Sequence, residues 1–162
     1  LFMVFTTGII KYNFDNYIFA GALLSFAITN WSPAKIFMGD IGSTFLGAYL
    51  LGLGFKLNSF IDATWFFSLT SPLLFDAFIC LIRRFKNSKS IFEAHKMHLY
   101  QRLHQAGWSH KKVTIFFCGE IFILCLSYLF SSILVTLLLV LTFLIFNSYI
   151  DKKFAINFKK LC

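Results

Sequence analysis

An apolar stretch from Val113 to Phe146 reads VTIFFCGEIFILCLSYLFSSILVTLLLVLTFLIF, with Glu120 as its one charged residue. A membrane-spanning helix needs roughly 20 mostly apolar residues, and this stretch is long enough for two such helices. We expect the turn between them at Tyr128 to Ser132. The stretch therefore predicts that this part of the chain crosses a membrane twice.

Further apolar stretches precede this pair. The four stretches are Leu1–Ile10, Tyr17–Thr29, Ile41–Leu57 and Phe60–Ile82. The first is short and resembles the truncated end of a spanning helix. No repeat, low-complexity linker or soluble domain interrupts them. We predict an all-α fold, a polytopic transmembrane helical bundle of about six segments that forms a single integral-membrane domain over residues 1–162.

The composition indicates the same class of protein. Of the 162 residues, 58% are hydrophobic and 14% are charged, and the mean hydropathy is +0.74. A soluble domain is nearer half apolar and about a quarter charged. The sequence starts inside an apolar run without the basic region of a signal peptide, so we interpret it as the C-terminal fragment of a longer protein.

The cysteines do not have the spacing of a disulfide framework or a zinc site. Cys80, Cys118 and Cys125 lie in apolar stretches, Cys162 is the last residue, and no Cys-x-x-Cys pair occurs. We therefore expect the first three to be small packing side chains.

The basic residues gather on one predicted face of the membrane. Eight lie between Arg83 and Lys112, and four more lie between Lys152 and Lys160. Basic loops stay on the cytoplasmic side, and two segments separate the clusters, so both are predicted to be cytoplasmic, as is the Asn30–Asp40 loop. The last lysines serve as topology signals or bind anionic lipid head groups. The 83–112 loop is too short and too closely tied to the membrane to bind nucleic acid.

The densest polar segment contains GDIGST at residues 39–44. Gly39 and Gly42 let the backbone approach a ligand closely, and the free amides of a helix start can receive an anion. Asp40 can hold a hard cation such as magnesium, which usually bridges a carboxylate to substrate phosphates. Together these parts describe a pyrophosphate-metal site, and the alternative is that Asp40 only caps the helix.

The longer segment PAKIFMGDIGS, Pro33 to Ser43, resembles the signature of the polyprenyl-phosphate sugar-phosphate transferase superfamily. This superfamily includes undecaprenyl-phosphate N-acetylglucosamine-1-phosphate transferase and phospho-N-acetylmuramoyl-pentapeptide transferase. The resemblance implies that Asp40 is catalytic and binds magnesium, or manganese in its place, and that Phe37 lies beside the uracil of the nucleotide substrate. Three further residues of the motif are implied to contact substrate: Lys35, Gly42 and Ser43.

A second similarity lies in PLLFD at residues 72–76, followed by Arg83 and Arg84. The superfamily has a similar proline-to-aspartate helix that ends in basic residues. Asp76 is expected about two turns inside the membrane boundary, where a carboxylate is costly and usually functional. The alternative is that Asp76 has a structural partner such as Arg83.

The segment SIFEAHKMHLYQRL at residues 90–103 resembles the histidine-rich cytoplasmic loop of the superfamily. His98 and Arg102 fit the usual pattern, whereas Tyr100 and Gln101 replace two further histidines. This variant resembles the branch that initiates O-antigen and related surface polysaccharides, and it leans towards 6-deoxy N-acetylhexosamines. We expect His95 and His98 to share a helical face and, with Arg102, to suit phosphate or sugar. Zinc is not favoured, because no further Cys or carboxylate cluster completes a site.

The resemblance implies transfer of a sugar 1-phosphate from a UDP-N-acetylhexosamine to undecaprenyl or another polyprenyl phosphate, with release of UMP. It implies an integral protein of the bacterial cytoplasmic membrane with a cytoplasmic active face, acting in surface-polysaccharide or cell-wall glycan synthesis. The chain has no Asp-Asp pair, and we expect that motif of the superfamily in a missing N-terminal half. The 162 residues alone are therefore expected to be inactive.

Two other classes of protein fit part of the sequence. A polytopic transporter or channel would also have six segments and intramembrane acids such as Asp62, Asp76 and Glu120, but it would not need the 39–44 motif at a cytoplasmic helix start. A non-catalytic truncated membrane protein would keep the hydropathy without keeping the motifs. We assign no role to Glu120.

Overall fold

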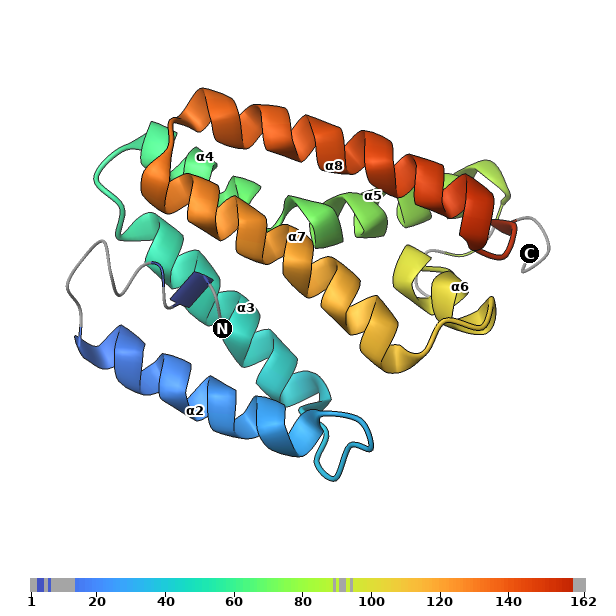
Figure 1. Ribbon diagram of the computed structural model, residues 1–162, viewed down its shortest axis with the longest axis horizontal. Coiled ribbons are helices and arrows are strands. Elements are labelled where there is room, and N and C mark those ends of the chain that lie inside the picture. The colour runs from blue at the N-terminus through green and yellow to red at the C-terminus, as the bar shows by residue number, and fades with distance from the viewer. Residues whose placement is uncertain are drawn as a thin grey trace. The chain divides into compact units, whose positions relative to one another are not determined.

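A computed structural model describes residues 3–4, 6, 14–88, 90, 93 and 95–158, and this part of the chain contains helices, turns and loops but no strand (Figure 1). The predicted all-α class is therefore confirmed. The Leu1–Ile10 segment lies mostly outside the described residues, as do the predicted basic residues Lys159 and Lys160. The helices with defined bounds are α2 Phe14–Asn30, α3 Gly39–Phe55, α4 Phe60–Ser68, α5 Ser71–Lys86, α6 Leu99–Gln105, α7 His110–Phe130 and α8 Ile133–Phe154.

The chain divides into two compact units, each with its own internal packing. The first unit comprises Leu1–Leu69 and Phe122–Thr136, and the second comprises Thr70–Ile121 and Leu137–Cys162. One boundary falls between α4 and α5, and the other two fall within α7 and α8. None lies at a polar linker, so hydropathy gives no sign of this division.

In the first unit, α2 and α3 lie side by side and are joined by the loop 31–38 (Figure 1). The ring centroids of Phe19 on α2 and Tyr49 on α3 are 4.3 Å apart. The Tyr49 hydroxyl donates a hydrogen bond to Asn16 Oδ1 at 2.8 Å. Asn16 is buried, so this bond offsets the cost of removing its amide from water. The two predicted segments Tyr17–Thr29 and Ile41–Leu57 are thus confirmed as helices, and they set the ends of the loop that they share.

Helix α4 packs against α3 where the backbone of Gly54 meets the ring of Phe67. A Cβ atom on residue 54 would overlap that ring. The absence of a side chain at Gly54 therefore permits the close approach of the two helices.

The predicted continuous segment Phe60–Ile82 is wrong in one respect, because α4 ends at Ser68 and α5 begins at Ser71. Pro72, in the first turn of α5, explains the interruption. Proline has no backbone N–H to donate, and its ring would clash with the carbonyl of Ser68 in a continuous helix.

The predicted turn between the last two helices is confirmed, since α7 ends at Phe130 and α8 begins at Ile133. Hydroxyl groups satisfy one another around it. Ser127 Oγ lies 2.7 Å from Thr136 Oγ1, and Trp65 Nε1 of α4 donates to the same Thr136 oxygen at 2.8 Å. Thr136 is fully buried, so these bonds keep a polar side chain from being stranded in apolar surroundings.

The second unit has a small apolar core between α6 and parts of α7 and α8. Its buried members are Leu99, Leu103, Val113, Phe117 and Ile150. This core fixes α6, and with it the chain segment that carries the predicted histidine site.

Two helices, α7 and α8, are long and apolar enough to cross a membrane, with mean hydropathies of 2.1 and 2.4 over their most apolar windows, and α4 with α5 makes a third if the pair is one broken span. Helices α2 and α3 have 17 residues each, at the lower end of the range for a span. On α7 and α8 large apolar side chains are exposed, among them Ile115 at 61% and Ile145 at 72%. An apolar surface of this kind indicates contact with lipid, and thus an integral membrane protein.

Candidate functional site

The loop 31–38 folds back onto the end of α2 through two hydrogen bonds. The Lys35 N–H donates to the Thr29 carbonyl at 3.0 Å, and Asn30 Nδ2 donates to the Ile36 carbonyl at 2.6 Å. The loop therefore has a defined shape. It leaves the Phe37 ring 79% exposed and the Lys35 side chain exposed, so both are accessible to a ligand.

Helix α3 begins at Gly39, whose φ of +65° lies in the left-handed region that favours glycine. Asp40 follows in the first turn and is exposed. The N-cap residue is Met38, which provides no side-chain cap. The alternative in which Asp40 is the cap residue is therefore wrong.

The Asp40 carboxylate is open to a ligand. Ser43 Oγ donates to the backbone carbonyl of Asp40 at 3.0 Å, not to its carboxylate. Among the residues that the structure describes, none forms a hydrogen bond or ion pair with that carboxylate. Mg²⁺ is commonly held by one or two carboxylates together with waters and phosphate oxygens. One accessible carboxylate beside unpaired helix-start amides fits that pattern, with the remaining ligands coming from water and phosphate.

In the second unit, Asp76 of α5 contacts the start of α6. Its Oδ1 accepts a hydrogen bond from the Leu99 N–H at 2.7 Å, and its Oδ2 lies 3.6 Å from His98 Nδ1. The alternative in which Arg83 is the partner of Asp76 is wrong, because Arg83 Nη1 instead pairs with Asp151 Oδ2 of α8 at 2.6 Å. A spacing of seven residues places Asp76 and Arg83 on the same face of a helix, which suggested the pairing. In the structure, each of them contacts a residue of another segment instead.

Arg102 is buried, with 3% of its side chain exposed, and pairs with the other oxygen of Asp151 at 2.5 Å. Its Nε donates to the Met97 carbonyl at 3.1 Å, and its Nη1 donates to the Ile156 carbonyl at 2.9 Å. The guanidinium also lies 5.6 Å from the centre of the Phe158 ring. Arg102 therefore joins α6 to the end of α8, and its substrate role stays a prediction.

The expected shared helical face of His95 and His98 is wrong, because residues 95–97 are not helical and His98 is the N-cap residue of α6. The two rings are nevertheless close, with centroids 5.0 Å apart. The His98 ring also stacks on Tyr100 at 5.5 Å. Burial, and then the nearby Asp76 carboxylate, raises the pKa of the Tyr100 hydroxyl, so this phenol stays protonated.

Sequence reasoning missed Cys80, which lies beside the two histidines. A signal for it was present, because Asp76 and Cys80 are four residues apart and so share a face of α5. Since Asp76 contacts His98, Cys80 on the same face also lies near the histidine segment.

Glu120 of α7 is buried and has a partner on α8. Asn147 Nδ2 donates to Glu120 Oε2 at 3.1 Å. A carboxylate within a membrane helix is costly, and this amide offsets part of that cost.

The predicted site residues fall into two groups. Lys35, Phe37, Asp40, Gly42 and Ser43 come together around the loop 31–38 and the first turn of α3, all in the first unit. His95, His98 and Arg102 lie at the start of α6 in the second unit.

Comparison with known proteins supports the superfamily resemblance. Residues 1–58 match the family model of glycosyl transferase family 4. This matched region contains the whole of the loop 31–38 and the Asp40 motif.

Curated relatives are similar over a longer stretch. The chain is 34% identical over 113 residues to the decaprenyl-phosphate N-acetylglucosaminephosphotransferase of Mycobacterium tuberculosis, covering 60% of this chain and 28% of that protein. It is 37% identical over 107 residues to a probable undecaprenyl-phosphate N-acetylglucosaminyl 1-phosphate transferase of Bacillus subtilis, covering 61% and 29%. It is 33% identical over 129 residues to a phospho-N-acetylmuramoyl-pentapeptide-transferase of Streptococcus agalactiae, covering 68% and 38%.

The chain thus spans about a third of the length of the curated relatives that it matches, between 28% and 38% in these three. No solved structure matches it. The resemblance to the polyprenyl-phosphate sugar-phosphate transferases is confirmed at the level of the superfamily.

Proposed function

We propose that this chain is part of a membrane transferase that moves N-acetylhexosamine 1-phosphate from a UDP-sugar to polyprenyl phosphate, such as undecaprenyl phosphate, and releases UMP. The product lipid would initiate synthesis of a surface polysaccharide, such as O-antigen, or of a cell-wall glycan. Two of the relatives named above are N-acetylglucosamine phosphate transferases named for a polyprenyl phosphate, and the third is a phospho-N-acetylmuramoyl-pentapeptide-transferase. Their names support this reaction type.

One observation carries the proposal. The accessible Asp40 carboxylate, which follows a glycine with positive φ at a helix start, lies inside the region that matches the family model. A carboxylate placed in this way is available to a ligand, whereas one that held the fold together would be paired with a protein group. The same motif supplies free amides for the phosphates of a nucleotide.

The chain's own residues would act by positioning and by charge. The phosphate oxygen of the lipid attacks the phosphorus that carries the sugar, and UMP leaves with the bonding electron pair, so one pyrophosphate bond replaces another. Catalysis of such a transfer depends mainly on holding the groups in line and stabilising negative charge. Phe37 would pack on the uracil, Lys35 and the free amides in the first turn of α3 would hold phosphate, and Gly42 and Ser43 would contact substrate.

The resemblance implies Mg²⁺, or Mn²⁺ in its place, and Asp40 is the residue that would hold it. Bound there, the ion would neutralise charge on the pyrophosphate. Asp40 would keep its carboxylate directed at that position from the first turn of α3.

The reaction fits a site at the membrane surface, since one substrate is a long isoprenoid and the other is a soluble nucleotide. The concentration of basic residues in the 83–112 loop and at residues 152–160 favours a cytoplasmic active face in the bacterial cytoplasmic membrane. The superfamily's paired aspartates, absent from this chain, would come from a further part of the same enzyme.

The test uses the full-length protein, read upstream of Leu1 in its gene, in detergent with magnesium. UMP release is followed with undecaprenyl phosphate and a panel of UDP-N-acetylhexosamines that includes the N-acetylglucosamine and 6-deoxy forms. We expect lipid-dependent UMP release from at least one donor, and Asp40→Asn to lower kcat at least about 100-fold, as loss of a charge-stabilising group does.

Asp62→Asn is the matched control, because Asp62 also lies in the first turn of a helix, α4. It should retain most of the rate. If no donor yields UMP from a folded protein, or if Asp40→Asn is as active as Asp62→Asn, the transferase proposal fails and a transporter becomes the better interpretation.

A further inference from the structure

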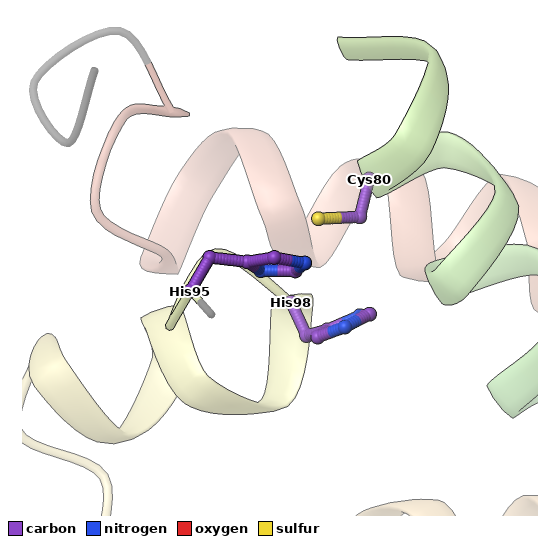
Figure 2. Close-up of side chains that lie close together, drawn as sticks. All are labelled: Cys80, His95 and His98. Atoms are coloured by element: carbon purple, nitrogen blue, oxygen red, sulfur yellow. The ribbon is translucent and has the colours of Figure 1, made fainter. Parts of the chain in front are cut away.

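Three potential metal ligands converge in the second unit (Figure 2). Cys80 comes from α5, and His95 and His98 come from the segment that leads into α6 (Figure 2). Each side chain offers one ligand atom, and these atoms all lie within 4.8 Å of one another. Residues 15 and 18 positions apart in sequence are thus brought together by the packing of α6 beside α5.

Their surroundings fit a bound cation better than ordinary packing. Cys80 is only 2% exposed, and His95 Nδ1 is buried and has no hydrogen-bond partner within the described part of the chain. A buried nitrogen with no partner is costly. A metal ion held through Nδ1 of His95 would give that nitrogen a partner.

Asp76 supplies the support that histidine ligands usually have. Its Oδ2 lies 3.6 Å from His98 Nδ1, and its Oδ1 is held by the Leu99 N–H at 2.7 Å. A carboxylate this close to the ring favours positive charge on it and on an ion bound to it. Such an outer carboxylate also orients the ring.

We propose that Cys80, His95 and His98 bind one Zn²⁺ ion. One thiolate and two imidazoles match zinc, whereas hard ions such as Mg²⁺ prefer oxygen ligands. Three protein ligands leave a fourth position for water. Asp76 and Cys80 also line a cavity of about 40 Å³, which has room for a water molecule.

This site uses residues other than Asp40 and does not depend on the proposed transferase reaction. The ion would connect α5 to the segment before α6 and so hold the histidine loop in place. Binding releases the thiol proton, so zinc affinity is expected to fall as the pH is lowered and protons compete for the ligands.

The first experiment loads the full-length protein, purified in detergent without a histidine tag and stripped with a chelator, with Co²⁺ as a spectroscopic substitute for Zn²⁺. We expect one Co²⁺ for each chain, with a thiolate-to-cobalt charge-transfer band and visible bands of tetrahedral Co²⁺. Cys80→Ser should abolish the charge-transfer band. Cys118→Ser is the matched control, because Cys118 is a free, exposed cysteine on α7, and it should keep the band.

The histidines and Asp76 give a graded series. His95→Gln should weaken zinc binding, measured by competition with a chelating dye, whereas the control His110→Gln should not. Asp76→Asn should weaken it roughly 10- to 100-fold, as loss of an outer carboxylate does. Equal spectra and affinities in Cys80→Ser and Cys118→Ser would overturn the site.

X-ray absorption on the zinc-loaded wild type requires no variant, so it decides the question even if Cys80→Ser does not fold. We expect one sulfur at about 2.3 Å and nitrogen or oxygen neighbours at about 2.0–2.1 Å. A shell of nitrogen and oxygen alone would rule out Cys80 as a ligand. Neither experiment measures UMP release, so failure here is distinct from failure of the transferase proposal.

Discussion

Two polar segments carry the residues that the superfamily resemblance singles out, and they differ in how their side chains are used. In the segment 33–43, the Asp40 carboxylate and the Phe37 ring are exposed. In the segment 95–103, Arg102 is 3% exposed and paired with Asp151, and His98 lies beside Asp76. One segment leaves its polar and aromatic groups exposed, and the other pairs its charged groups within the protein.

The difference shows what a sequence motif can leave open. From sequence alone, a charged side chain in a loop suits substrate binding whether it is exposed or already paired with another protein group. An arginine whose three nitrogens are each paired must break such pairings before it can hold a phosphate, whereas an accessible carboxylate has no protein partner to lose. We therefore expect substitutions in the first segment to change activity and substitutions in the second to change stability.

The largest effect on stability is expected for Arg102→Met. Removing this side chain leaves the Asp151 carboxylate, whose side chain is 11% exposed, without its buried partner. Breaking a buried ion pair costs about 3–5 kcal/mol. Arg83→Met is the matched control, because Arg83 contacts the same carboxylate but is 35% exposed. Its loss should cost at most about 1 kcal/mol.

The two arginine variants are compared by thermal unfolding of the full-length protein in detergent, with UMP release measured beside it. Arg102→Met should lower the Tm well below that of Arg83→Met. An Arg102→Met protein with a wild-type Tm but a raised KM for the UDP-sugar would show that Arg102 serves substrate, and the contrast between the segments would break down.

The next effect in size concerns Phe37→Ala, which tests the exposed segment. If the ring stacks on the uracil, its loss should cost about 1–3 kcal/mol of binding, roughly a 5- to 150-fold rise in KM for the UDP-sugar. Because the ring is 79% exposed, the Tm should stay unchanged. Phe60→Ala is the control, since Phe60 is 86% exposed at the start of α4. Equal KM values for the two variants would remove Phe37 from the nucleotide site.

Much of the fold was predictable, because run length and hydropathy determine which segments can be membrane helices. The turn near Ser131 and the helices on both sides of the loop 31–38 followed from that pattern alone. The break before Ser71 did not follow from it. Pro72 lies within an otherwise apolar run, and such a proline can either start a new helix or be accommodated inside one membrane helix, so the sequence alone does not distinguish the two cases.

The two parts of the candidate site were predictable to different degrees. The Asp40 motif is contiguous, so its glycines, carboxylate and helix start could be read together. The histidine segment depends on partners that are far away in sequence. Asp151 lies next to two lysines and resembles part of a basic tail, yet it pairs with Arg83 and Arg102. Local pattern does not encode such pairings, and the packing of α6 and α8 creates them.

The smallest effects should separate two glycines of α3. Gly39 has a φ of +65°, whereas Gly47 lies inside the helix with open space where a Cβ atom would stand. An L-residue in the left-handed region costs roughly 1–2 kcal/mol. An alanine that fits a helix without strain instead adds about 0.4–1 kcal/mol of stability. Gly39→Ala should therefore lower the Tm or shift the chain out of its native turn, and Gly47→Ala should raise the Tm slightly.

Activity sharpens the comparison between these glycines. Gly39 precedes Asp40 directly, so relief of the strain at residue 39 would move the carboxylate, and UMP release should fall in Gly39→Ala even where the protein remains folded. Gly47→Ala, two turns further along α3, should release UMP at the wild-type rate. If both variants kept full activity, the position of Asp40 would not depend on the left-handed conformation of residue 39. The function of the 33–43 segment would then depend on which side chains it carries and not on its backbone conformation at that residue.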